Sequence, residues 1–148
     1  MASKIALLDV NILIALFDIK HQHHDLVSRW FIKWRDDGHG WASCPMTQNG
    51  CIRVLSLPNY PNSLALQEIK QKLTRAVQDP SHTFIHDNIS LLQDDLINWR
   101  HIQGSRQLTD TYLLALAKHN QAVFVSLDGR IEMSTVIGAC DEHFIIVD

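Results

Sequence analysis

The chain has 148 residues, a length typical of one domain that buries its own core. Its composition, with 46% hydrophobic and 20% charged residues, is that of an ordinary globular protein and not of a disordered chain. The formal net charge of -3 argues against the broadly basic surface of many nucleic-acid-binding proteins, although it is compatible with a local basic rim.

Cysteine usage and hydropathy together indicate the compartment. Cys44, Cys51 and Cys140 are odd in number and lack the spacing of a metal site, so we expect free thiols in a reducing environment. No charged segment precedes a signal-type apolar run, and Asp9 and Asn11 interrupt the longest apolar stretch. These features predict a cytoplasmic protein without a membrane span.

Apolar runs along the chain predict strands that alternate with helices. The run at 5–8 is short and bounded, as in a buried strand, and the run at 12–17 behind Asn11 as an N-cap predicts the first helix. Further helices are expected at 24–34, 45–55, 63–73, 89–99 and 109–119, and further strands at 41–44, 83–85, 122–126 and 143–147. This alternation predicts parallel βαβ units, and thus a single α/β/α sandwich domain over residues 1–148 with a mostly parallel central sheet.

Two aspartates follow buried-type strands directly. Asp9 comes after the first apolar run, and Asp128 follows the strand expected at 122–126. Open parallel sheets bind ligands beyond the carboxyl ends of their strands, so both carboxylates are expected in one crevice. Each could instead cap the helix or turn that follows it.

Two further polar residues lie on helix faces that are otherwise apolar. Asp110 is followed at i+3, i+4 and i+7 by Leu113, Leu114 and Ala117, so its carboxylate is expected to face inward. Charge matching to the helix N-terminus explains an aspartate in the first turn but not its place on the apolar face. Gln48 shows the same spacing, with Cys51, Ile52 and Leu55 following it.

Three converging carboxylates cannot all stay ionised without a counter-charge. Hard oxygen ligands in an open arrangement suit Mg²⁺ or Mn²⁺, which retain water molecules and bind phosphates. Asp9, Asp110 and Asp128 therefore indicate metal-dependent phosphoester chemistry, with Gln48 as the fourth wall of the crevice.

Four motifs in order give the sequence a family resemblance. They are LLDVN at 7–11, CPMTQNG at 44–50, LTDTYLLALA at 108–117 and VSLDGR at 125–130. In this order they resemble a PIN domain, and more narrowly the VapC toxins of bacterial type II toxin-antitoxin modules. The resemblance implies an endoribonuclease that depends on Mg²⁺ or Mn²⁺, is usually a homodimer, and is silenced by a cognate antitoxin bound at or near the active site.

The resemblance also assigns residues. The family's acidic positions fall on Asp9, Asp110 and Asp128, whereas the usual glutamate of the third helix falls on Gln48. An amide still offers one oxygen ligand, but the site loses a negative charge and should hold its cation less tightly. Glu132 is a candidate replacement carboxylate, although an ordinary exposed residue is the favoured interpretation.

Other polar residues are candidates for supporting roles. Asn11 and Ser126 could orient the ligands. Candidates for contact with RNA phosphate are Arg53, Arg106 and Arg130, with surface ion pairs as the alternative. The histidines of the early loop, His21, His23 and His24, have no cysteine partner and are expected to form a solvated turn and not a metal site.

Alternative functions were weighed against the ribonuclease. A degenerate PIN domain that binds RNA or an antitoxin without cleavage would account for Gln48. A haloacid-dehalogenase-like phosphatase needs a second aspartate two residues after the first, where this chain has Asn11. A phosphoreceiver domain is disfavoured because no early aspartate pair precedes Asp9.

Overall fold

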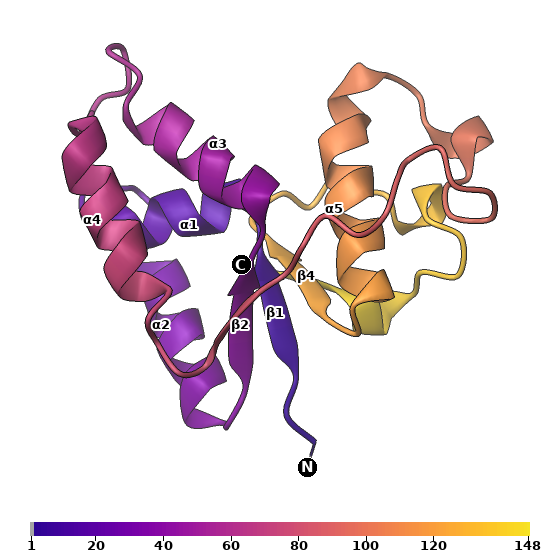
Figure 1. Cartoon of the computed structure of the whole chain (residues 1–148), viewed down its shortest axis with the longest axis horizontal. Helices are drawn as coiled ribbons and strands as arrows, with labels where there is room; N and C mark the ends of the chain where they lie inside the picture. The colour runs from indigo at the N-terminus through magenta and orange to yellow at the C-terminus, as the bar shows by residue number, and fades with distance from the viewer. Residues whose placement is uncertain (1) are drawn as a thin grey trace.

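A five-stranded parallel sheet forms the centre of the structure, a computed structural model that describes residues 2–148 (Figure 1). Every strand pair is parallel, and the strands lie in the order β3-β2-β1-β4-β5. Their bounds are β1 (Ile5–Leu8), β2 (Gly40–Ser43), β3 (His82–Phe84), β4 (Val123–Ser126) and β5 (Phe144–Ile146). The strand order reverses at β1 and β4, the position at which open α/β sheets form their ligand crevice.

Helices cover both faces of this sheet, which confirms the α/β/α sandwich. One face carries α1 (Val10–Phe17), α2 (His24–Asp36), α3 (Pro45–Leu55) and α4 (Leu66–Ala76), and the other carries α5 (Leu108–His119) (Figure 1). Alternate residues of β1 point to opposite faces, as the strand pleat requires. Ala6 and Leu8 accordingly pack in the core under α1 to α4, and Leu7 packs in the core under α5.

A glycine brings α3 against α1 close to the expected crevice. A Cβ atom at Gly50 would lie 2.6 Å from Cγ2 of Val10, so only glycine permits this approach of the two helices. Val10 adjoins Asp9, and Gly50 lies two residues after Gln48. The contact therefore holds the first turns of α3 beside the start of α1.

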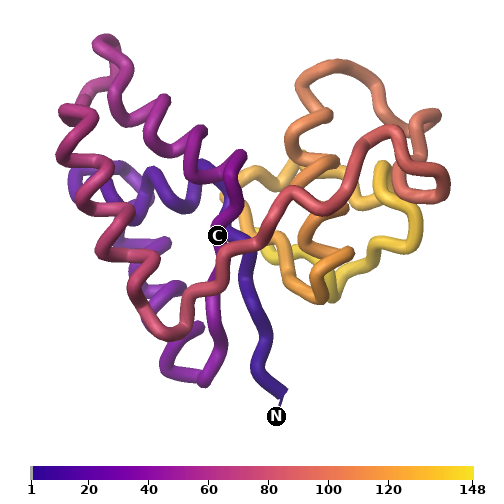
Figure 2. The backbone as a smooth tube through the Cα atoms, in the orientation of Figure 1, coloured from indigo at the N-terminus to yellow at the C-terminus, as the bar shows by residue number. Residues whose placement is uncertain are grey.

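The helix expected at 89–99 is wrong. That stretch consists of turns, an isolated bridge between Ile97 and Val136, and a 3₁₀ turn that begins at Trp99. Asp95 has φ 62°, a left-handed conformation that no α-helix continues through, and Leu92 is 84% exposed instead of packing. The buried anchors Ile89 and Ile97 produced a helix-like spacing in what is an irregular crossing over the α5 side (Figure 2).

Two helix starts also differ from the sequence prediction. The first helix begins at Val10, because the Asp9 side chain and not Asn11 caps it. The fourth begins at Leu66 and not at 63. Within residues 2–148, no helix combines the length and apolar character needed to cross a membrane.

Candidate active site

Asp9 lies where β1 ends and α1 begins. Its Oδ1 accepts a hydrogen bond of 2.7 Å from the backbone N–H of Val10, and its Oδ2 accepts one of 2.6 Å from the hydroxyl of Ser126. Only 6% of the residue is exposed, and burial together with the nearby Asp128 carboxylate raises the pKa of Asp9 despite these two hydrogen bonds. A fixed, desolvated carboxylate of this kind gains free energy from a cation.

Ser126, at the end of β4, joins both strand-end aspartates. Its hydroxyl donates to Asp9, and its oxygen accepts the backbone N–H of Asp128 at 3.0 Å and the Asn11 amide Nδ2 at 3.1 Å. The Asn11 oxygen accepts the backbone N–H of Leu127 at 3.1 Å. These contacts connect Asp9 and Asp128 at the carboxyl ends of neighbouring strands, and the orienting role of Asn11 and Ser126 stays a prediction.

Asp128 forms an ion pair with Arg130. The guanidinium of Arg130 donates from Nε to Oδ1 at 3.0 Å and from NH2 to Oδ2 at 3.2 Å, and the Arg130 backbone N–H also reaches Oδ1 at 2.9 Å. These bonds hold the pKa of Asp128 below its ordinary value. Arg130 is 89% exposed, so this pair is weak enough to exchange for another partner.

Asp110 enters from the first turn of α5 on the other side of the crevice. Desolvation, followed by the charges of Asp9 and Asp128, raises the pKa of Asp110 to about 6. The charges of Asp9 and Asp128 therefore act on Asp110, and the joint role of the three aspartates stays a prediction. The oxygens of all three do not come within 4.8 Å of one another, since among residues 2–148 only Cys140, Glu142 and His143 meet that criterion.

The raised pKa of Asp110 predicts a pH-dependent destabilisation of the metal-free protein. Because the folded-state pKa exceeds the ordinary value of 3.8, the effect is absent at low pH, grows as pH rises from about 4 to about 6, and is full above that. Asp110→Asn should therefore raise the free energy of unfolding in EDTA by about 1–2 kcal/mol at neutral pH, after discounting for solvent screening.

Urea denaturation at about pH 4 and about pH 7 measures this effect. Asp94→Asn is a matched control on an exposed loop and should show no such pH-dependent gain. If Asp110→Asn and wild type have the same free energy of unfolding at neutral pH, the ionised Asp110 carboxylate does not destabilise the folded protein, and the expectation is wrong.

Gln48, in the first turns of α3, is held by a chain of hydrogen bonds that the sequence did not reveal. Its amide Nε2 donates to the buried hydroxyl of Ser43 at 2.9 Å, and that hydroxyl lies 2.8 Å from Nε2 of His82. Burial lowers the pKa of His82, so its neutral imidazole can accept a hydrogen bond from the Ser43 hydroxyl. Because Nε2 of Gln48 makes the bond to Ser43, the amide oxygen is left without a hydrogen-bond partner within residues 2–148.

Other candidate residues lie at the surface. Arg53, Arg106 and Glu132 are exposed, and no ion pair involves them within residues 2–148. The histidine loop forms a turn whose three histidines are half-buried and not fully solvated. His24 Nδ1 lies 2.7 Å from the Ala15 carbonyl, and His21 Nδ1 accepts the His23 N–H. The three cysteines are free thiols, as predicted, although Cys140 is exposed.

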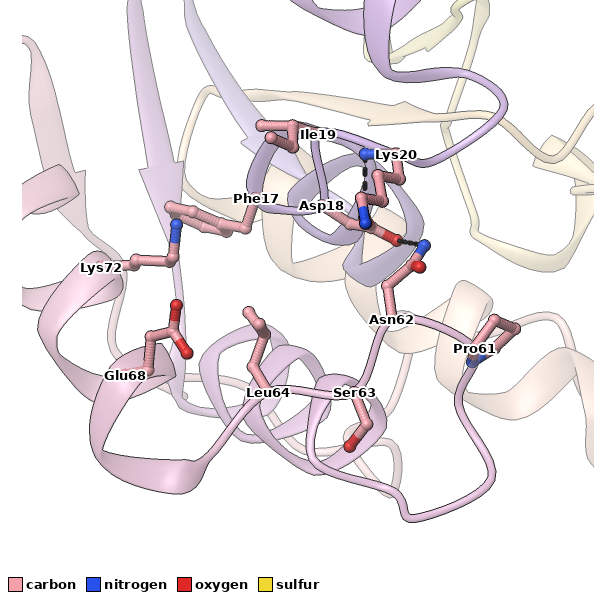
Figure 3. Close-up of a pocket in the computed structure, with 10 residues that line it drawn as sticks. All are labelled: Phe17, Asp18, Ile19, Lys20, Pro61, Asn62, Ser63, Leu64, Glu68 and Lys72. Atoms are coloured by element: carbon pink, nitrogen blue, oxygen red, sulfur yellow. Dashed lines mark hydrogen bonds between the residues drawn. The ribbon is translucent and has the colours of Figure 1, made fainter.

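Two further features, a cavity and a cluster of potential metal ligands, lie outside the crevice. A cavity of about 390 Å³ lies at the far end of α1 (Figure 3), where the Asp18 oxygens are already satisfied by Tyr60, Asn62 and the Lys20 backbone. The Cys140 cluster precedes β5 and so lies at the amino edge of the sheet, opposite the crevice. Neither adjoins the strand-end aspartates.

A parallel sheet in this order, with aspartates after β1 and β4 and a third on α5, is consistent with an α/β fold of the PIN-domain class. No protein-family model matches the chain. The proteins similar to it include three ribonucleases of Mycobacterium tuberculosis. Ribonuclease VapC44 is 38% identical over 138 residues, which cover 93% of this chain and 96% of that protein. Ribonuclease VapC38 is 35% identical over 127 residues, which cover 85% of this chain and 86% of that protein. Ribonuclease VapC39 is 31% identical over 134 residues, which cover 90% of this chain and 95% of that protein. The chain therefore belongs to the VapC family of PIN-domain ribonucleases.

Proposed function

We propose that this protein is the toxin of a type II toxin-antitoxin module and an endoribonuclease that hydrolyses RNA phosphodiester bonds with Mg²⁺ or Mn²⁺. The observation that carries the proposal is the pair of strand-end aspartates at the switch point. The Ser126 hydroxyl donates to the Asp9 carboxylate and accepts the backbone N–H of Asp128, and the charges of both aspartates act on Asp110. Family membership supports the ribonuclease activity.

The donor set suits a hard divalent cation. Asp9 and Asp110 have raised pKa values, and within residues 2–148 neither forms an ion pair with a cationic side chain. Asp9, Asp110 and Asp128 would hold the cation, and Gln48 would face it with an amide oxygen. Such an ion, when bound, activates water and stabilises the charge that develops on a phosphodiester.

The fold holds the Asp9 carboxylate in a fixed position before any ligand binds. Asp9 is fixed by the Val10 N–H and the Ser126 hydroxyl, so its oxygens need no reorganisation when a ligand arrives. Exposed arginines near the crevice, Arg130 above all, and Arg106 and Arg53 farther out, are proposed contacts for RNA phosphates. Arg130 would exchange Asp128 for phosphate as substrate binds.

The partners follow from the same proposal. A cognate antitoxin would silence the enzyme at or near the crevice, and the active protein would be a homodimer of single PIN-like domains spanning residues 1–148. We propose the cytoplasm as its place of action because its substrate is cellular RNA. A degenerate domain that binds RNA without cleavage is not favoured, because similar proteins are named ribonucleases.

Metal removal tests the proposed function. Purified protein should cleave a structured RNA in Mg²⁺ or Mn²⁺, lose this activity in EDTA, and regain it when either ion is returned in excess. The products should be the same before and after restoration, which separates this enzyme from a contaminating nuclease. Cleavage that persists unchanged in EDTA would contradict the metal-dependent mechanism.

A further inference from the structure

A second cavity is lined by residues that neighbour Asp110 and Gln48 in the chain, and it has no part in the roles assigned above. It measures about 430 Å³ and lies between the starts of α3 and α5 and the segment that follows β3. Its walls are mainly apolar and include Met46, Leu91, Leu108 and the ring of the buried Tyr112. Apolar cavities with a few fixed polar groups are typical of small-ligand sites.

Two residues that line this cavity are close neighbours in the chain of residues assigned to the crevice. Thr109 lines it and directly precedes Asp110, and Met46 lines it two residues before Gln48. The segment after β3 leaves the sheet at the same carboxyl edge as Asp9 and Asp128, because all five strands are parallel. A nucleotide with its phosphate at the aspartates would bring an adjacent base to this cavity.

The carboxylate of Asp87 lines the cavity, and within residues 2–148 only one of its two oxygens accepts a hydrogen bond. The Tyr112 hydroxyl donates to Oδ1 of Asp87 at 2.7 Å, which orients the carboxylate at the rim. Within residues 2–148, the other oxygen of Asp87 accepts no hydrogen bond and the residue is exposed. A carboxylate accepts hydrogen bonds and cannot donate them, so it selects a ligand with donors on its edge.

We propose that the cavity binds one unpaired base of the RNA substrate beside the scissile phosphate, and that Asp87 makes guanine the preferred base. Proteins recognise RNA sequence mainly through unpaired bases, which stack on aromatic or apolar walls and bond along their Watson–Crick edges. Guanine alone of the four bases presents two adjacent donors there, N1–H and the 2-amino group, to an acceptor such as Asp87. This proposal rests on the proposed ribonuclease function and deepens it.

A binding measurement tests the site without cleavage. In protein labelled at its methionine methyl groups, guanosine 5′-monophosphate should shift the NMR signal of Met46, which lines the cavity, through the ring current of the base. Met133 packs elsewhere, against the α5 core, and should not respond. Uridine 5′-monophosphate should give a smaller shift at the same millimolar concentration. Equal responses of Met46 and Met133, or none, would overturn the proposal.

A cleavage measurement tests the role of Asp87. Asp87→Asn keeps an acceptor for Tyr112 and should lower the preference for guanine at one position next to the cut by about 10-fold, the size expected for one good base contact. Asp94→Asn, on the same exposed segment, is the control and should leave the cut-site profile unchanged. An Asp87→Asn profile identical to this control would overturn the proposal.

Two further outcomes distinguish the base-binding proposal from the proposed ribonuclease function and from antitoxin binding at the cavity. If wild type binds guanosine monophosphate at Met46 but cleaves no RNA, the proposed function fails while the base site stands. If Leu91→Ala weakens antitoxin binding but leaves both the nucleotide shift and the cut-site profile unchanged, the cavity serves the antitoxin and the base site is wrong.

Discussion

Replacing Asp9 with asparagine is expected to lower RNA cleavage by about 10³-fold or more, the largest effect of any single change in this protein. Asp9 is the most buried of the three aspartates, and both its oxygens are held in place by Val10 and Ser126. The variant removes a negative charge from the centre of the crevice without changing the size of the side chain. Initial rates on a defined RNA, measured at saturating Mg²⁺, give this loss directly.

The folded state should survive this change. Asparagine is as good an N-cap as aspartate, so α1 keeps its first hydrogen bond. Loss of the buried charge should also raise the thermal midpoint of the metal-free protein slightly, since burial opposes the ionised form of Asp9. Cleavage within a few-fold of wild type in a folded variant would exclude Asp9 from the mechanism.

Replacing Gln48 with glutamate is expected to strengthen Mg²⁺ binding and raise cleavage at limiting Mg²⁺ by about 10-fold, because ligand charge sets the affinity of such sites. The surrounding hydrogen bonds can adapt to the change. Ser43 would donate to the new carboxylate, and His82 would donate to Ser43 from Nε2 in its other tautomer. Isothermal titration with Mg²⁺ and rates across a Mg²⁺ series measure the two effects.

Gln67→Glu provides the control for added charge, since Gln67 is an exposed residue of α4. It should leave the Mg²⁺ affinity unchanged. If Gln48→Glu behaves like this control, the amide does not face the cation and α3 contributes no ligand. If it binds Mg²⁺ more weakly than wild type, the Ser43 and His82 hydrogen bonds fix an orientation that a carboxylate cannot adopt.

The strand-end aspartates could be predicted because their signals are local. A short apolar run followed by aspartate fixes both a buried strand and a carboxylate at its end, and β1 and β4 follow this pattern. Asp110 was predictable for a similar reason, since helical spacing alone places it on the inward face of α5. The order of the strands was not predicted, since the rules for parallel connections restrict the possible orders but do not select one.

Features that depend on residues far apart in the chain could not be predicted in this way. The contact of Ser43 with His82 spans 39 residues and depends on the register of β2 and β3. The segment after β3 has helical spacing, but its buried residues Ile89 and Ile97 pack against tertiary neighbours that no local pattern reveals. The cavity beside Asp110 combines three such segments and has no signature in the sequence.

The central claim is that Asp9, Asp110 and Asp128 together hold one divalent cation, and anomalous diffraction from a Mn²⁺-soaked crystal tests it most directly. We expect an anomalous peak in contact with carboxylate oxygens of all three aspartates, with Arg130 displaced from Asp128. A peak only at Cys140, Glu142 and His143, or no peak within the crevice at saturating Mn²⁺, would contradict the account.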